Sequence, residues 1–480
     1  MDAIKIHPAD NVEVLLKKRG DICAGHKVAL DDIATGEKII KYGFPIGVAS
    51  TNIKKGDWVH VHNVKTLLNE TAEYFYNPHV ANKTDVSKLK PLTFKGYRRA
   101  NGSVGIRNEI WIVPVVGCVN SIASRLAALN ASLVKGNVEG LYSFSHPYGC
   151  SQTGADHART RKLLAALCRH PNAGGVLVLH LGCENITPEQ FRAELGDVDT
   201  SRVKFLVCQE VEDEIAEGSR LLAEIAEAMA NDRREDIDAS ELVIGMKCGG
   251  SDGLSGITAN PVVGRFSDLL TALGGTTILT EIPEMFGAEP ILFNRASNRE
   301  VFEKAAKIVK DFKDYFISHN EVVYENPSPG NKAGGITTLE DKSCGCVQKG
   351  GSSPVVDAID YGERVVLKGL NIMSGPGNDL VSATALTAAG AHIVLFTTGR
   401  GTPFGAPAPT VKISTNSALY TKKRNWIDFN AGTLADASET LEEAGLRLLN
   451  YVMAVASGEK TTAETNNARE IAIFKTGVTL

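Results

Sequence analysis

Five cysteines stand just after apolar segments of strand length in this sequence. They are Cys118, Cys150, Cys183, Cys208 and Cys248. Because the carboxyl ends of parallel strands meet at one edge of a sheet, such cysteines would gather thiols along that edge. Thiolates are soft ligands for iron, zinc or iron–sulfur clusters, so we predict a metal site that uses Cys150, Cys183 and Cys248. Inert packing thiols are the alternative, and no Cys-x-x-Cys pair marks a standard zinc or ferredoxin motif.

The most informative stretch is ELVIGMKCGGSDGLSGITANP, residues 241–261. An apolar run leads through Lys247 and Cys248 into a glycine-rich loop, which is typical of a strand that ends at a binding edge. A tight turn with a packed thiol is the alternative interpretation. Lys247 is a candidate general base if it is buried beside a metal.

Polar side chains also follow other apolar segments of this half of the chain. They are Glu281, Glu284, Asn378, Asp379, Thr397, Thr398 and Arg400. Arg400 with Thr397 and Thr398 could hold a substrate carboxylate through paired hydrogen bonds. Arg107 and Lys332 are further substrate-binding candidates. The segment TTGRGTPFG is no dinucleotide fingerprint, because its prolines prevent the helix that should follow.

Three histidines stand near the N-terminus, His26 in AGHK and the pair His60 and His62 in HVHN. Residues two apart on a strand share a face, so His60 and His62 would project together and bind a metal, bind an anion or share a proton. Histidine titrates near neutrality, and we therefore predict catalytic acid or base roles for all three. Surface imidazoles on an exposed sheet are the alternative.

The elements that must position these residues fall into three regions. Short alternating segments broken by glycine predict an all-β module over residues 1–70, in which DIATGEKII and NIKKGDWVH pair. A polar stretch without periodicity predicts a linker over 71–95. Alternating strand and helix patterns then predict two α/β units with parallel sheets, residues 96–235 and 236–480. Residues 326–353, rich in Gly, Pro, Lys and Ser, are expected to form a long functional or mobile loop.

The bulk composition is that of a soluble protein of several domains, with 480 residues, 43% of them hydrophobic, and a formal net charge of −5. A general nucleic-acid or anionic-membrane binder needs a basic face, so neither partner is expected. The N-terminus lacks the regions of a signal peptide, and no apolar run reaches the length of a membrane span. Nine cysteines without dense spacing favour reduced thiols and a cytoplasmic protein.

Seven motifs are long enough to be specific: YRRANGSVGIRNEIWIVP, SHPYGCSQTG, LGCEN, CGGSDGLSGITANP, EIPEMFGAE, NPSPGNKAGG and FTTGRGTP. They resemble the altronate and galactarate dehydratase family. With GHK, KYGFPIG and HVHN near the N-terminus and AIFKTGVTL at the C-terminus, the resemblance covers nearly the whole chain. It implies a cytoplasmic hydro-lyase of hexuronate breakdown that converts D-altronate to 2-dehydro-3-deoxy-D-gluconate and water, with galactarate as the alternative substrate. It also implies a β-clip module of the SAF type, two Rossmann-like α/β units, ferrous iron and a homodimer.

Dehydration of such a sugar acid requires removal of the proton beside the carboxylate and departure of the neighbouring hydroxyl. A divalent metal would stabilise the enolate-like charge: we expect Fe²⁺, with Mn²⁺ as the alternative and an iron–sulfur cluster left open. The histidines of the β module would close over the metal edge as acid and base. Two other classes stay open, a nicotinamide-dependent oxidoreductase, which lacks its fingerprint, and a sugar-acid sensor, which the β module would suit.

Overall fold

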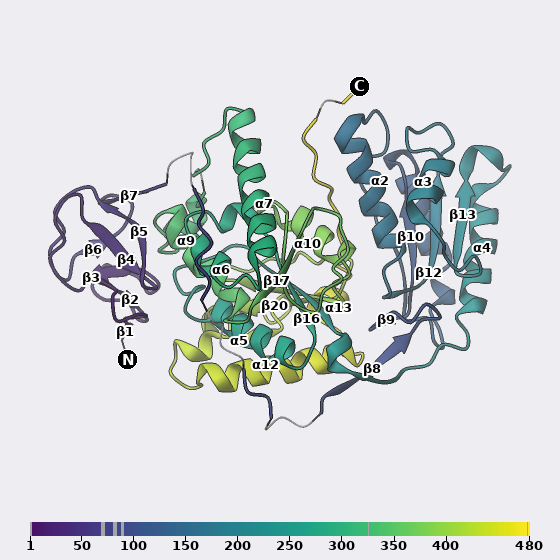
Figure 1. The fold of residues 1–480 in the computed structure, drawn as a ribbon. Helices are drawn as coiled ribbons and strands as arrows, with labels where there is room; N and C mark the ends of the chain where they lie inside the picture. The colour runs from purple at the N-terminus through teal and green to yellow at the C-terminus, as the bar shows by residue number, and fades with distance from the viewer. Residues whose placement is uncertain (1, 69–72, 80–83, 88–90, 325, 478) are drawn as a thin grey trace.

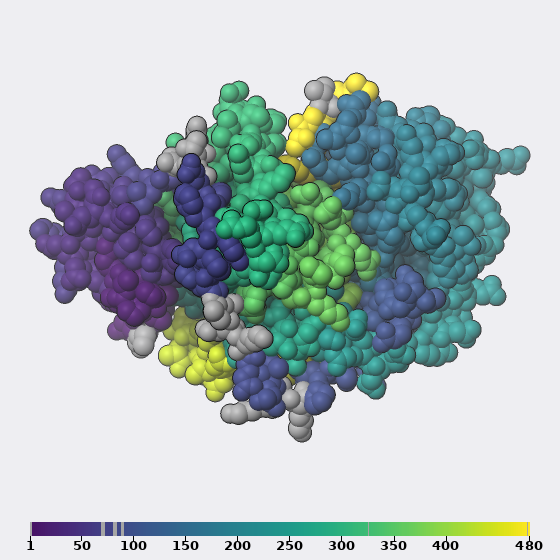
Figure 2. Space-filling model, in the orientation of Figure 1, coloured from purple at the N-terminus to yellow at the C-terminus, as the bar shows by residue number. Residues whose placement is uncertain are grey.

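The structure, a computed structural model, describes residues 2–68, 73–79, 84–87, 91–324, 326–477 and 479–480. Figure 1 shows three regions in a row: the N-terminal β module at one end, the C-terminal domain in the centre and the middle domain at the other end. The space-filling view shows the same order, with the N-terminal module packed against the central domain (Figure 2). None of the described helices is long and apolar enough to cross a membrane.

The N-terminal module is built entirely of β-strands, as predicted. One sheet has the order β1-β2-β3-β6 and the other the order β4-β5-β7. Their bounds are β1 (Ala3–Ile4), β2 (Val12–Leu15), β3 (Lys27–Ala29), β4 (Lys38–Lys41), β5 (Phe44–Ala49), β6 (Trp58–Val59) and β7 (Val64–Lys65). The two glycine-centred segments pair through an antiparallel bridge between Ile33 and Ile53, which confirms their predicted pairing.

The middle domain is a parallel sheet of order β11-β10-β12-β13 with helices on both faces. The strands are β10 (Glu109–Pro114), β11 (Gly140–Ser143), β12 (Ala173–His180) and β13 (Val203–Val207), and the helices are α1 (Asn120–Leu129), α2 (Gly154–Cys168), α3 (Pro188–Leu195) and α4 (Glu214–Ala228). Alternate residues of β10 face opposite sides: Trp111 and Val113 join the core under α2 and α3, whereas Ile110 and Ile112 join the core under α1 and α4.

The C-terminal domain holds a parallel sheet of order β17-β18-β16-β15-β19-β20-β21. Its strands are β15 (Val243–Cys248), β16 (Thr276–Leu279), β17 (Val355–Ile359), β18 (Gly369–Met373), β19 (Ile393–Thr398), β20 (Thr410–Ser414) and β21 (Phe429–Asn430). Its helices are α5 (Ala259–Ala272), α6 (Glu289–Phe293), α7 (Arg299–Ser318), α10 (Asp379–Ala388), α11 (Ser417–Lys422), α12 (Leu441–Ala456) and α13 (Thr462–Thr465). The strand order reverses direction between β15 and β19, where open α/β sheets bind ligands. The α/β prediction is confirmed for both units.

The predicted linker is attached to the body where the structure describes it. The Tyr74 hydroxyl donates a hydrogen bond to Glu289 Oε1 at 2.8 Å, and the ring of Tyr76 lies against Phe302. At its end, β8 (Thr93–Arg98) pairs with β14 (Glu235–Asp238) and β9 (Val104–Gly105). The rest of the predicted linker, residues 71–72, 80–83 and 88–90, lies outside the described residues.

The prediction of a long loop at residues 326–353 is wrong, because three helical segments lie within this stretch. They are α8 (Pro329–Ala333), α9 (Leu339–Cys346) and the 3-10 helix η6 (Val347–Gly350). Thr338 caps α9 by accepting a hydrogen bond from the backbone of Asp341, so a helix begins where the composition suggested only a loop. α9 carries Cys346 at its end.

Candidate functional site

Three side chains from three elements meet beneath the point where the C-terminal sheet reverses. Cys248 ends β15, Glu284 ends the 3-10 helix η5 (Ile282–Glu284) after β16, and Cys346 ends α9. Cys248 Sγ lies 3.0 Å from Glu284 Oε2 and 3.4 Å from Cys346 Sγ, and Cys346 Sγ lies 3.1 Å from the same oxygen. All three residues are buried. In the part of the chain that the structure describes, no other group of three His, Cys, Asp or Glu donors is as compact, within 4.8 Å.

Two buried lysines set the charge of this cluster. Lys342 Nζ lies 2.8 Å from Glu284 Oε1, and Lys349 Nζ of η6 lies 3.6 Å from Glu281 Oε2. Burial would raise the pKa of Glu284, but these two ammonium groups lower it to about 2. A hydrogen bond from the Cys346 thiol lowers the pKa of Cys248 to about 6 against the effect of burial. Cys248 is therefore poised to be a thiolate near neutral pH.

A second carboxylate, Glu281, fixes the position of Cys248 through its backbone. Its Oε2 accepts a hydrogen bond from the Cys248 backbone at 2.8 Å, and its Oε1 lies 3.0 Å from Lys247 Nζ. Glu281 has a φ of 70°, in the left-handed region that non-glycine residues rarely adopt. Such strain persists where the surrounding structure over-determines a residue, as at functional sites.

The cluster opens into a pocket of about 580 Å³ at the carboxyl edge of the sheet. This volume is in the range of small-molecule sites. Cys248 and Glu284 lie on its wall, together with Lys332 of α8, Lys342 of α9 and Asp379 at the start of α10. Thus two cations and two carboxylates surround a space large enough for a sugar acid.

The chemistry of the donor set fits a thiophilic divalent cation. The two sulfur atoms and one carboxylate oxygen come from a site whose lysines and carboxylates otherwise balance, so a bound cation would offset the added thiolate charge. A set of three protein ligands also leaves coordination positions for substrate, as catalytic sites require. Cys248, Glu284 and Cys346 are the residues that could hold such an ion.

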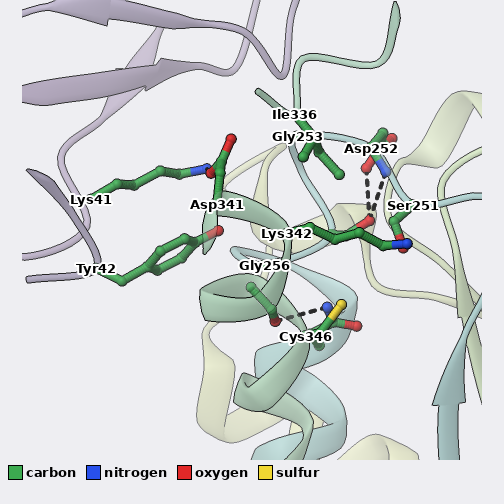
Figure 3. A pocket seen from close by; sticks show the side chains of 13 residues that line it. Lys41, Tyr42, Ser251, Asp252, Gly253, Gly256, Ile336, Asp341, Lys342 and Cys346 are labelled. Atoms are coloured by element: carbon green, nitrogen blue, oxygen red, sulfur yellow. Dashed lines mark hydrogen bonds and ion pairs between the residues drawn. The ribbon is translucent and has the colours of Figure 1, made fainter. Parts of the chain in front are cut away.

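The N-terminal module is locked onto the helix that carries Cys346. Asp341 of α9 lies 2.7 Å from Lys27 Nζ and 3.0 Å from Lys41 Nζ, and all three side chains are buried. Figure 3 shows Lys41 and Tyr42 reaching from the module toward Asp341, with Lys342 and Cys346 on the same helix. The cavity left between them is only about 10 Å³, which holds at most one water. The module therefore acts as a packed wall behind the site.

The three histidines of the module gather around Trp58 and do not line the pocket. His26 Nδ1 accepts a hydrogen bond from Trp58 Nε1 at 3.1 Å, and Trp58 stacks on His60 with ring centroids 5.0 Å apart. Burial and then the charge of Lys27 lower the pKa of His60 to about 4, so it stays neutral. The prediction that His60 and His62 share a strand face is wrong, because β6 ends at Val59 and a turn follows.

The predicted metal triad is only partly assembled. Cys248 belongs to the buried cluster, whereas Cys150 and Cys183 are exposed in the middle domain and do not join it. The strand-end rule placed all three at sheet edges correctly, but the chain forms two separate sheets, and so two edges. Lys247 as a base is also contradicted: burial would lower its pKa, but Glu281 and Asp379 raise it, so it stays a cation.

Of the other predicted substrate-binding residues, some have structural partners and one lines the pocket. Arg107 is contradicted, because it is buried and its guanidinium donates to both oxygens of Glu464 at 2.7 and 3.0 Å. Thr397 donates to Asn260 Oδ1 and Thr398 accepts from the Gly401 backbone, so both buried hydroxyls serve the fold. Lys332 lines the pocket.

Arg400 is exposed, and its backbone lies near Gly250, which lines the pocket. Its role stays a prediction. The predicted set of metal ligands omitted Cys346 and Glu284. Glu284 was visible as a polar residue after a strand, whereas Cys346 stood in a stretch with no periodic signal.

Three family models match the chain in order. "Altronate/galactarate dehydratase SAF domain" matches residues 16–67, "D-galactarate dehydratase/Altronate hydrolase, second domain" matches 96–230, and "D-galactarate/Altronate dehydratase, C-terminal" matches 239–479. The last two fall on the two parallel sheets, and the first falls on the β module.

Full-length relatives agree with these models. The chain is 53% identical to an altronate dehydratase of Bacillus subtilis (strain 168) over 99% of both chains. It is 51% identical to an altronate dehydratase of Escherichia coli (strain K12) over 100% of both. It is 35% identical to a galactarate dehydratase (L-threo-forming) of Escherichia coli (strain K12), over 96% of this chain and 93% of that one.

Proposed function

This chain belongs to the altronate and galactarate dehydratase family, and we propose that the pocket above Cys248, Glu284 and Cys346 is its active site. The enzyme is a hydro-lyase that dehydrates D-altronate to 2-dehydro-3-deoxy-D-gluconate. The observation that carries the placement is the buried dithiol–carboxylate cluster on the wall of a pocket that also presents Lys332, Lys342 and Asp379.

Ferrous iron is the cofactor that we propose, held by Cys248, Glu284 and Cys346. When bound, it would polarise the carboxylate and hydroxyl oxygens of the substrate and so acidify the neighbouring C–H bond. The two sulfur donors favour iron over Mn²⁺, which prefers oxygen ligands.

The side chains of the pocket supply the rest of the chemistry. Lys332 attracts the substrate carboxylate into the site. Asp379, whose Oδ1 is paired with Lys247 Nζ at 2.5 Å, takes the proton from the carbon beside that carboxylate. Lys342, which Glu284 holds as a cation, gives a proton to the departing hydroxyl. Water leaves, and the enol that remains becomes the 2-keto-3-deoxy acid.

An anaerobic assay tests the proposal. The purified chain is stripped with a chelator, mixed with D-altronate and assayed for a 2-keto-3-deoxy acid without any nicotinamide. We expect no turnover until ferrous iron is added and full recovery with ferrous iron alone. Full turnover by the metal-free protein would refute the proposal that the reaction requires iron.

Galactarate is the second candidate substrate, because the chain is 35% identical to a galactarate dehydratase over nearly its full length. Comparing kcat/KM for the two acids under the same conditions decides between them. The family resemblance supports a homodimer, and the resemblance together with the cysteine spacing supports a cytoplasmic location. Light scattering of the purified chain tests the first, and cell fractionation tests the second.

A further inference from the structure

The middle domain holds a second set of thiols that the proposed active site does not use. Cys118, Cys150 and Cys183 follow the adjacent strands β10, β11 and β12, and all three are exposed. Free cysteine is among the most buried residue types, and of the other six cysteines only Cys23 is exposed. Three exposed thiols at one sheet edge therefore need an explanation other than packing.

Each of the three cysteines lies in the same four-residue pattern: glycine, cysteine, any residue, then a carboxamide. The copies are GCVN at 117–120, GCSQ at 149–152 and GCEN at 182–185. They sit on the loops after β10, β11 and β12, the strands on both sides of the point where the order of this sheet reverses. The thiols thus stand where a sheet of this kind binds a ligand.

The carboxamides tie the three loops to one another. Asn120 donates to the carbonyl of His146 at 2.8 Å and accepts from its N–H at 3.3 Å, which joins the first loop to the second. Asn185 Oδ1 accepts from the Ser151 N–H at 2.7 Å, which joins the third loop to the second. These bonds hold the loops without using the sulfur atoms.

The glycines allow the loops to come this close. A Cβ on Gly117 would lie 2.8 Å from the carbonyl oxygen of His146, and one on Gly149 would lie 2.1 Å from that of Val115. Gly149 also has a φ of 94°, which other residues rarely adopt. The pattern therefore builds a fixed arrangement of thiols.

A buried group beside the thiols lacks a partner. Gln152, two residues after Cys150, is only 4% exposed, and its Nε2 makes no hydrogen bond within the residues that the structure describes. His180, the last residue of β12, is fully buried against Phe191 and Phe205, and its Nδ1 lies 2.5 Å from Glu184 Oε1. Buried polar atoms are nearly always paired, so the amide nitrogen of Gln152 indicates that another group occupies this edge.

We propose that Cys118, Cys150 and Cys183 bind an iron–sulfur cluster through three thiolates, with one iron left open at the exposed edge. Among the residues that the structure describes, none of these three cysteines belongs to a group of three His, Cys, Asp or Glu donors within 4.8 Å, the spacing that one ion would need. A cluster binds each sulfur at a different iron and accepts wider spacing. On transfer of an assembled cluster, each thiol loses its proton to solvent and its sulfur bonds one iron.

The test is reconstitution of the full-length chain under anaerobic conditions with ferric iron, sulfide and a thiol reductant. Iron, acid-labile sulfide and visible absorbance are then measured per chain. We expect the wild type and Cys23→Ser, a control at the one other exposed cysteine, to take up iron and sulfide equally. Cys118→Ser, Cys150→Ser and Cys183→Ser should each take up at least about tenfold less. Because these positions are exposed, their thermal midpoints should match the wild type.

Cys346→Ala separates this site from the proposed active site. We expect it to lose dehydratase activity and keep the visible absorbance of the cluster. The proposal is overturned if the wild type gains no sulfide-dependent absorbance, if the three serine variants keep it, or if Cys346→Ala abolishes it. In that last case the cluster belongs to the buried thiols. Failure of the cluster with intact iron-dependent activity would leave the proposed active site standing.

Discussion

The two parallel sheets of this protein place cysteines at their carboxyl edges in opposite environments. At the C-terminal edge, Cys248 is 1% exposed and contacts Cys346 and a carboxylate. At the middle edge, Cys150 and Cys183 are exposed, and no third donor lies close enough to share one ion with them in the described residues. A strand-end position therefore fixes where a thiol lies, and what covers the edge decides its chemistry.

The cover at the C-terminal edge is α9, held down by the N-terminal module. Asp341 on α9 pairs with Lys27 and Lys41 of the module, five residues before Cys346 on the same helix. Burial strengthens the electrostatic interactions around the thiols, which suits proton abstraction. The open edge has the accessibility expected of a cluster with a free iron.

The largest expected effect comes from removing the carboxylate that contacts both buried thiols. Glu284→Gln would leave Lys342 without its carboxylate partner and take one anionic donor from the metal. We expect kcat/KM for altronate to fall at least about 1,000-fold, or about 4 kcal/mol, with bound iron reduced. Steady-state kinetics and metal analysis measure both.

Glu289→Gln is the matched control for that substitution. Glu289 is equally buried and pairs with Lys313 at 3.1 Å, but it does not line the pocket. It should lower stability while preserving turnover per folded molecule. Equal losses of turnover in the two variants would show that Glu284 has only a structural role.

The next effect concerns solvent access to the buried thiols, which should increase when α9 is no longer held by the N-terminal module. Asp341→Asn removes the counter-charge of Lys27 and Lys41. We expect a loss of about 3 kcal/mol in unfolding free energy, the lower end for a broken buried pair, because Asn can still accept from Thr337. Cys248 and Cys346 should then react with a maleimide in the native protein. Unchanged labelling would mean that the module does not control access.

Asp379→Asn tests the base without disturbing the thiols. Bound iron and both pocket lysines remain, so we expect kcat to fall about 100-fold with metal content unchanged. The control is Asp357→Asn on β17, whose Oδ1 contacts Lys304 at 3.3 Å away from the pocket. A normal kcat in Asp379→Asn would move the base elsewhere in the pocket, with Lys332 the next candidate.

The stability contributed by the ion pairs of Asp341 with Lys27 and Lys41 should also depend on pH. Burial opposes ionisation of Asp341, but Lys27 and Lys41 hold its pKa below the ordinary value. A carboxylate with a lowered folded-state pKa contributes stability above about pH 4 and loses it as the pH falls further. Below that pH the wild type should lose stability more steeply than Asp341→Asn, by up to about 1.4 kcal/mol per pH unit. Parallel curves in denaturant titrations would contradict this.

Much of this architecture could be predicted from the sequence, because it depends on local patterns. Alternation in the first 70 residues gave the β module, and apolar runs before glycine gave the strands of both sheets. Glu284 and Cys248 were placed correctly at strand ends for the same reason.

The pairing of distant elements could not be predicted in this way. Cys346 reaches Cys248 only because a short helix folds under the N-terminal module, and the contacts that hold it, such as Lys27 to Asp341, span over 300 residues. Likewise, Arg107 is paired with Glu464, a residue near the C-terminus, and no local pattern around Arg107 indicates that contact. Tertiary contacts of this kind leave no periodic signal in the sequence.

The smallest expected effect is a change in unfolding free energy, and it is measured by replacing cysteine with serine at an exposed position and at a buried one. Cys150→Ser changes an exposed thiol and should alter the unfolding free energy by less than about 0.5 kcal/mol. Cys344→Ser changes a fully buried thiol on α9 and should cost about 1–3 kcal/mol, because a hydroxyl is desolvated there without an assured partner. Urea unfolding of both variants, with native thiol labelling, measures the difference. In the wild type, the four exposed thiols, Cys23 included, should react before the five buried ones. If Cys150→Ser proved as costly as Cys344→Ser, the middle edge would be covered in solution, and the contrast between the two edges would fail.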